Sequence, residues 1–202
     1  MKQFQNKLIE TFVPKDNEAF ENIEQLIMID SLTKLPNYYY FKDVFDRKWR
    51  SAVRKQEPIS LIIFDFDHLG LFNDQYGFAA GDETLKKIAN KIKSMLHRPD
   101  DFLAHYEGGK FILILPETNM NGALQVGERL RLGIENMKIP HSLSSTSKYV
   151  TLSFGIGTKS PYVWEDPQLF IKAVEQAMHT AKQNGRNQVI WSNVFIHQTE
   201  SD

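Results

Sequence analysis

The chain has 202 residues, of which 42% are hydrophobic and 12% aromatic, so it is long enough for one domain with a substantial core. Its formal net charge of -1, with acids and bases interspersed, excludes a strongly basic nucleic-acid surface and a surface suited to anionic membranes. The absence of cysteine excludes disulfides and thiolate metal sites and is compatible with a cytoplasmic protein, and the apolar runs are too short for a transmembrane helix or a signal peptide.

The first 29 residues show apolar side chains at helical spacing in two stretches separated by Pro14. The stretches are marked by Phe4, Leu8 and Phe12, and by Phe20, Ile23 and Ile27. The spacing predicts two short helices, and it is too short to diagnose a coiled coil. We therefore predict a helical extension at residues 1–29 and one domain at residues 30–202.

A polar loop from Asp30 to Asn37 precedes the next predicted helix. Asn37 is suited to cap the start of this helix, whose apolar side chains recur at helical spacing through residues 41–49. The aromatic run at residues 38–41 could form a stacking platform or part of the core. Aromatic side chains on helices mostly belong to the core, so we predict core.

Residues 59–64 form an apolar run that predicts a strand and delivers Asp65 and Asp67 at its carboxyl end. Paired carboxylates at a strand end are suited to a divalent cation and a phosphate ester. Next to them, His68 is expected to make a loop hydrogen bond and not to bind a metal. Further along, one interpretation places Asn73 in a turn and Asp82 at the N-cap of a predicted helix at residues 83–97, and a nucleotide-binding alternative for both is given below.

A tight hairpin is predicted between residues 104 and 118. Two apolar runs, the second at residues 111–115, are separated by Glu107-Gly108-Gly109-Lys110, and a Gly-Gly pair between such runs favours a tight turn. The second run is almost wholly apolar, which predicts a central strand covered on both faces. The remaining predicted elements are a helix at 119–137, a loop at 141–148, a strand at 149–158, a loop at 161–167 containing Trp164, a helix at 168–183 and a strand at 188–191.

Five segments together resemble the GGDEF domain of diguanylate cyclases, in the order and spacing of that family. They are SLTKLPN, FDFDHLGLFNDQYGFAAGDETL, HYEGGKFILILPET, VTLSFGIG and AKQNGRNQVI. The resemblance covers about residues 30–191. It implies an α+β, palm-like nucleotidyl-cyclase sandwich with a central mixed sheet flanked by helices. It also suggests that residues 1–29 contact a partner protein or a second protomer, although packing against their own domain is the alternative.

The family signature differs in this chain. Glu107 and Gly108 align with the two glycines of the signature, and Gly109 and Lys110 align with its two acids. Magnesium takes oxygen ligands, commonly carboxylates, and at an effective dielectric of ~20 like charges about 4 Å apart repel by roughly 4 kcal/mol. We therefore predict a degenerate domain that is not an enzyme and needs no cofactor. Mg²⁺ is expected only if the remnant still binds GTP.

Other positions match nucleotide-binding residues of the family. Asp65 and the Phe66 carbonyl match metal ligands, and Asn73 and Asp82 match the pair that recognises guanine. The triphosphate-binding basic pair is matched by two residues at the end of the last helix, Lys182 and Arg186. A helix C-terminus also favours basic residues for electrostatic reasons. Gly70 replaces a lysine that contacts phosphate in the family.

The inhibitory site for cyclic di-GMP is matched by Arg98, Asp101 and Arg129. Arginine can pair with a phosphate or with the Hoogsteen edge of guanine, and aspartate can accept hydrogen bonds from the base. We therefore predict a catalytically inactive cyclic di-GMP receptor. The alternatives are a protein–protein scaffold without nucleotide binding and a GTP-binding domain with residual activity.

Overall fold

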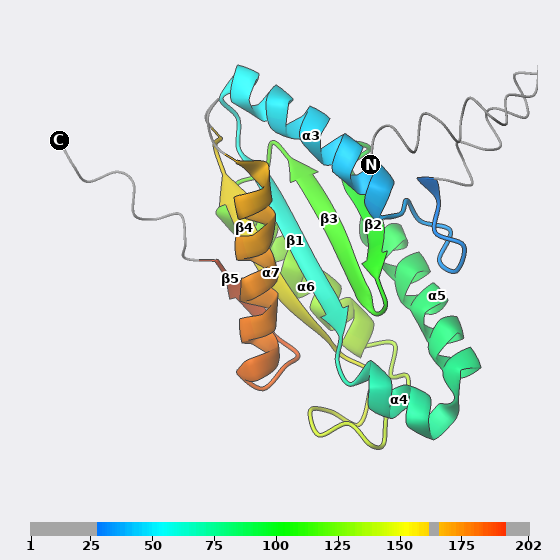
Figure 1. The fold of residues 1–202 in the computed structure, drawn as a ribbon. Helices are drawn as coiled ribbons and strands as arrows, with labels where there is room; N and C mark the ends of the chain where they lie inside the picture. Colours follow the sequence, from blue (N-terminus) through cyan, green and yellow to red (C-terminus); the bar gives the residue numbers. More distant parts are fainter. Residues whose placement is uncertain (1–27, 162–165, 193–202) are drawn as a thin grey trace, which may run out of the picture.

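The structure, a computed structural model, describes residues 28–161 and 166–192 and consists of one five-stranded sheet with helices on both faces (Figure 1). The strand order is β2-β3-β1-β4-β5. The strands are β1 (Ile59–Phe66), β2 (Phe102–Glu107), β3 (Lys110–Pro116), β4 (Leu152–Lys159) and β5 (Val189–Trp191). β1 is antiparallel to both of its neighbours, β3 and β4, whereas β5 runs parallel to β4. The predicted mixed sheet is confirmed.

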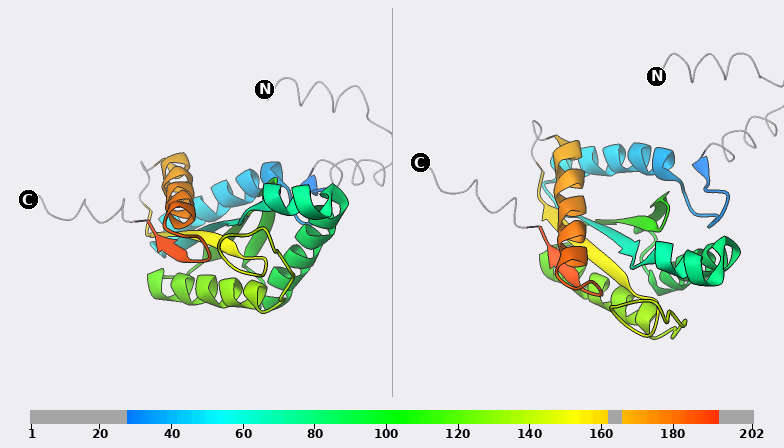
Figure 2. Two further views of the ribbon diagram at one scale, coloured as in Figure 1. Left: turned by 90° about the horizontal axis from the view of Figure 1, so that it is seen from below. Right: turned by 60° about the horizontal axis from the view of Figure 1, so that its bottom comes forward.

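The helices divide between the two faces of the sheet, as Figure 2 shows. α3 (Tyr38–Lys55) and α7 (Pro167–Gln183) cover one face, and α5 (Phe78–Met95) and α6 (Met120–Glu135) cover the other. The short helix α4 (Leu69–Tyr76) follows the end of β1. The predicted α+β sandwich is therefore confirmed.

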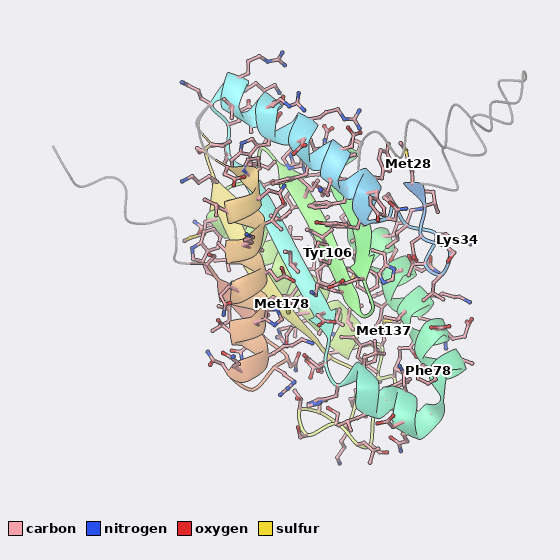
Figure 3. All side chains as sticks on the ribbon, viewed as in Figure 1. Met28, Lys34, Phe78, Tyr106, Met137 and Met178 are labelled. Atoms are coloured by element: carbon pink, nitrogen blue, oxygen red, sulfur yellow. The ribbon has the colours of Figure 1, made fainter. Side chains whose placement is uncertain are left out.

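β1 is apolar throughout because its two faces pack against different cores. Leu61 and Ile63 belong to the core under α3 and α7, whereas Ile62 and Phe64 belong to the core with α5 and α6. Successive side chains of a strand point to opposite faces, so a strand buried on both sides needs a continuous apolar run. On the first face, Met178 and Tyr106 lie between the helices and the sheet (Figure 3).

Close packing of α7 on β4 depends on a residue without a side chain. A Cβ atom at Gly155 would lie 2.2 Å from the Val174 carbonyl oxygen and 2.3 Å from the Met178 amide nitrogen. Both atoms are backbone atoms and cannot rotate away. Gly155 therefore sets how closely α7 approaches the sheet, and α7 carries side chains of the site described below.

The starts of α3 and α6 agree with the helix starts predicted from the sequence, whereas the start of α5 does not. Asn37 and Asn119 cap α3 and α6 with their side chains, and the first of these caps was predicted. The predicted N-cap at Asp82 is wrong, because α5 begins at Phe78 and Gly77 occupies the N-cap position. The helix ends at Met95, two residues before the predicted end at residue 97. Asp82 lies inside this helix, so capping does not explain its presence.

The aromatic run at the start of α3 is core only in part. Phe41 is fully buried, whereas Tyr39 is 66% exposed, so the core prediction is wrong for Tyr39. The helices predicted before residue 28 and the loop position of Trp164 lie outside the described residues, and the boundary between residues 29 and 30 stays a prediction. No helix in the described part of the chain is long and apolar enough to cross a membrane.

Candidate nucleotide site at the hairpin rim

The predicted hairpin forms and places its glycine turn beside the end of β1. Gly108 adopts a left-handed φ of 54°, and Asp65 lies opposite Lys110 in the register of β1 and β3. The Phe66 amide donates to the Gly109 carbonyl at 3.1 Å. A Cβ atom at Gly109 would lie 2.9 Å from Asp65 Oδ1, so this glycine lets the turn approach the carboxylate.

Lys182, in the last turn of α7, reaches the same strand end. Its Nζ lies 2.6 Å from Asp65 Oδ2 and donates to the Phe66 carbonyl oxygen at 3.2 Å. The side chains of Lys182 and Asp65 are 22% and 20% exposed. The ammonium group therefore bonds both oxygens that the sequence predicted as metal ligands.

The second lysine at the rim is held by a residue that the sequence analysis missed. Lys110 Nζ lies 2.7 Å from Glu175 Oε1 on α7 and 3.0 Å from Glu107 Oε1, and its side chain is only 12% exposed. Burial lowers the pKa of Lys110, but the hydrogen bonds to Glu175 and Glu107 outweigh it and raise the pKa above its ordinary value. The available signal was the spacing of Glu175 and Lys182, which are seven residues apart and therefore share one face of α7.

The family resemblance implies a divalent cation at this rim, but the residues as they lie do not fit one. Both candidate ligands, Asp65 and Phe66, already bond to an ammonium group. Within residues 28–161 and 166–192, no cluster of three or more histidine, aspartate or glutamate side chains could hold a metal ion. Magnesium demands near-octahedral oxygen coordination and tolerates such competition poorly.

Asp67 is a structural residue that fixes the loop after α7. It is fully buried and accepts hydrogen bonds from Thr151 Oγ1 at 2.9 Å, Ser153 Oγ at 2.7 Å and the Asn187 amide at 3.1 Å. Arg186 and Asn187 have positive φ values of 65° and 44°. The buried carboxyl group thus holds the strained loop that carries Arg186 next to the rim.

The predicted guanine pair comes from two different helices. Asn73 lies on α4, where a turn was predicted, and Asp82 is exposed on α5. Asn73 Oδ1 is buried without a hydrogen-bond partner among the described residues. A Cβ atom at Gly81 would lie 2.0 Å from this oxygen, so Asn73 packs directly against the backbone beside Asp82.

His68 and His105 connect loops around the rim. His68 Nε2 lies 3.3 Å from Thr146 Oγ1, which confirms the predicted loop hydrogen bond. The side chain of His105, by contrast, bonds with the opening loop and with the hairpin turn. Its Nδ1 lies 3.0 Å from Asp30 Oδ1, and its Nε2 lies 2.9 Å from the Gly108 carbonyl oxygen.

The predicted cyclic di-GMP residues gather at the other end of the hairpin. Arg98 and Asp101 precede β2, and Arg129 is exposed on α6. Arg98 Nη1 donates to Thr118 Oγ1 at 2.8 Å. Asp101 Oδ1 is buried and has no hydrogen-bond partner among the described residues. Burial raises the pKa of Asp101, and the nearby guanidinium groups of Arg98 and Arg129 oppose this shift without cancelling it.

Comparison with protein families matches residues 27–188 to the family described as diguanylate cyclase, GGDEF domain. The chain belongs to the GGDEF family. Its curated relatives include diguanylate cyclase DosC of Shigella sonnei, 31% identical over 176 residues, and diguanylate cyclase A of Treponema denticola, 31% identical over 194 residues. The alignments cover 86% and 94% of this chain, but the chain spans only 37% and 51% of the length of the two relatives.

A solved GGDEF structure has the same fold. The coiled coil and GGDEF domain of DgcB from Caulobacter crescentus, in complex with c-di-GMP, superposes with a TM-score of 0.77. Its sequence is 27% identical, and the match covers 86% of this chain and 90% of that chain. The fold and family expected from the sequence are thus confirmed, and the label degenerate stays a prediction.

The prediction that this GGDEF domain is not an enzyme is contradicted by the comparisons. Its curated relatives are named diguanylate cyclases. The prediction rested on the loss of a hairpin carboxylate, where Gly109 stands, and on an uncompensated ammonium group at Lys110 beside the metal position. In the structure, Glu175 and Glu107 pair with that ammonium group. The repulsion inferred from the sequence was therefore too large, because it left out these two negative charges.

Proposed function

We propose that this GGDEF domain acts in cyclic di-GMP signalling and binds cyclic di-GMP at Arg98, Asp101 and Arg129. The observation that supports the proposal best is Asp101 Oδ1, a buried acceptor without a partner among the described residues. A buried polar atom left unbonded is costly, so a ligand that donates to it would be favoured. The complex of DgcB with c-di-GMP is consistent with this assignment.

The chemistry of the three side chains suits a guanine nucleotide. The Watson–Crick edge of guanine offers N–H donors to the carboxylate of Asp101. The planar forks of Arg98 and Arg129 can bond in pairs to guanine O6 and N7 or to a phosphate. Both arginines are exposed, so they can reorient towards a ligand.

Isothermal titration calorimetry with cyclic di-GMP tests the proposal. We expect saturable binding to the parent protein and a loss of at least about tenfold in affinity for Arg98→Ala and for Asp101→Ala, because a hydrogen bond involving a charged group contributes about 1.5–3 kcal/mol. Arg50→Ala, which removes an exposed arginine on α3, serves as the matched control and should bind like the parent. No heat with the parent protein would reject the receptor role.

A second candidate function is condensation of two GTP molecules to cyclic di-GMP at the rim, in which each 3′-hydroxyl displaces pyrophosphate from the α-phosphate of the other molecule; the names of the relatives favour this candidate. In this proposal Asn73 and Asp82 contact guanine, and Lys182 and Arg186 contact the phosphates. Incubation with GTP and Mg²⁺ or Mn²⁺, followed by chromatography, should then yield cyclic di-GMP from the parent and none from Asp65→Asn. Absence of product from the parent would reject this candidate.

Titrations that show neither cyclic di-GMP nor GTP binding would favour the remaining alternative, a protein-interaction scaffold. In that case residues 1–29 would provide the contact with a partner protein or a second protomer. Nucleotide-induced thermal stabilisation distinguishes the two outcomes, because a ligand that binds only the folded state raises the melting temperature.

A further inference from the structure

We infer that the ammonium group of Lys182 is the resident cation of the Asp65–Phe66 oxygen pair, and that Lys182 must exchange these oxygens for nucleotide phosphate before a divalent cation can use them. The second half of the inference rests on the proposed GTP binding, whereas the first half does not. The inference explains why Asp65 and the Phe66 carbonyl, which match metal ligands of the family, do not fit a metal ion as they lie in this structure.

The contacts at the strand end carry the first half. Lys182 Nζ approaches Asp65 Oδ2 to 2.6 Å and the Phe66 carbonyl oxygen to 3.2 Å. A charged carboxylate and a carbonyl dipole are the environment that a small cation requires. Among the described residues, Lys182 is the cation paired with Asp65.

The neighbouring ion pair keeps Lys182 in this position. Lys110, directly opposite Asp65 in the sheet, bonds instead to Glu175 and Glu107. Lys110 already has two carboxylate partners, so Lys182 is the ammonium group that neutralises Asp65. A divalent cation bound to the same two oxygens would be repelled by Lys182 unless this ammonium group moved away.

Lys182 can leave the oxygen pair when an anionic alternative is offered. Its side chain is flexible and partly exposed, and it lies in the last turn of α7 close to the loop of Arg186. A phosphate oxygen would replace the carboxylate as partner of the ammonium group. Asp65 and nucleotide phosphate thus compete for Lys182, so each weakens the binding of the other.

The first test measures Mn²⁺ binding without nucleotide by electron paramagnetic resonance. We expect no saturable binding to the parent up to about 1 mM and at least about tenfold tighter binding to Lys182→Met. Lys172→Met, an exposed lysine on the same helix, is the matched control and should behave like the parent. A melting curve for each variant verifies that it is folded.

The second test measures the affinity of a non-hydrolysable GTP analogue in EDTA by calorimetry. Competition for Lys182 predicts that Asp65→Asn tightens binding several-fold and that Lys182→Met weakens it. Loss of the Asp65 charge also relieves its repulsion of the triphosphate, so Asp65→Asn is measured in the Lys182→Met background as well. Competition for Lys182 predicts that Asp65→Asn tightens binding less in that background than in the parent.

Two results would overturn the inference. The first is that the parent and Lys182→Met bind Mn²⁺ equally, either both tightly or both not at all. The second is that Asp65→Asn binds the GTP analogue no more tightly than the parent does. If the parent binds no analogue at all, the GTP proposal and the exchange fail together. The Mn²⁺ titration still decides whether Lys182 is the resident cation.

Discussion

Asp67 offers the sharpest test of how the rim is held together. Its carboxyl group is fully buried and accepts hydrogen bonds from two side-chain hydroxyls and one backbone amide, those of Thr151, Ser153 and Asn187. Asp67→Ala would leave all three donors without this acceptor. Asp67→Asn keeps the shape but replaces one acceptor oxygen with a donor.

The two substitutions should differ in cost. The hydroxyl groups of Thr151 and Ser153 can rotate and accept a hydrogen bond from an introduced amide, whereas the Asn187 amide can only donate. An asparagine can therefore direct its oxygen to Asn187 and its nitrogen to a hydroxyl, which limits the loss to about 1–2 kcal/mol. Alanine should cost about 3–5 kcal/mol, because the partly buried amide of Asn187 and the two hydroxyl groups then lose their shared acceptor.

Urea denaturation followed by circular dichroism measures these free energies of unfolding. Asp74→Ala, an exposed carboxylate on α4, is the matched control and should change stability by less than about 0.5 kcal/mol. If Asp67→Ala and Asp67→Asn destabilise the domain equally, or if alanine costs less than about 1 kcal/mol, the hydrogen-bond argument is wrong.

Three further predictions concern packing, acid stability and capping. Gly155→Ala should destabilise by about 3 kcal/mol because its Cβ meets backbone atoms of α7, and an unchanged melting temperature would contradict that packing. Burial raises the pKa of Asp30, but hydrogen bonds from Thr33 and the contact with His105 outweigh it and lower the pKa. Asp30 thus adds stability that is present above pH ~3.8 and lost as the pH falls through the folded-state pKa, so Asp30→Asn should flatten this acid limb in urea titrations at several pH values. Asn119→Ala should cost about 1 kcal/mol in the same assay, and Asn121→Ala, within the helix, should cost less.

Local signals in the sequence were sufficient for most elements of the fold. The Gly108–Gly109 pair between apolar runs predicted the hairpin, and Asn37 predicted the start of α3. Asp82 misled because a carboxylate before a helical run looks like an N-cap. In the structure α5 starts directly after Gly77, which has no side chain that could cap the helix. The sequence therefore contains no capping residue that would indicate this start.

The candidate site was predictable only where one segment supplies the residues. Asp65 and Phe66 are the last two residues of β1, and their position at the rim could be inferred from that one segment. Glu175 and Lys182 reach the rim only because α7 packs closely on β4, and that distance depends on a tertiary contact at Gly155. The electrostatic argument from the sequence failed for this reason, since it weighed Lys110 without the helix that supplies its counter-charge.

The two proposed nucleotide sites lie at opposite ends of one hairpin. Arg98 and Asp101 precede the first residue of β2, whereas the glycine turn follows its last residue. A strand of this length spans about 20 Å at ~3.4 Å per residue, which exceeds the range over which substitutions usually interact. Loss of charge at Lys182 should therefore leave the Arg98 cluster intact, so binding of cyclic di-GMP and chemistry at the rim are separable properties of this domain.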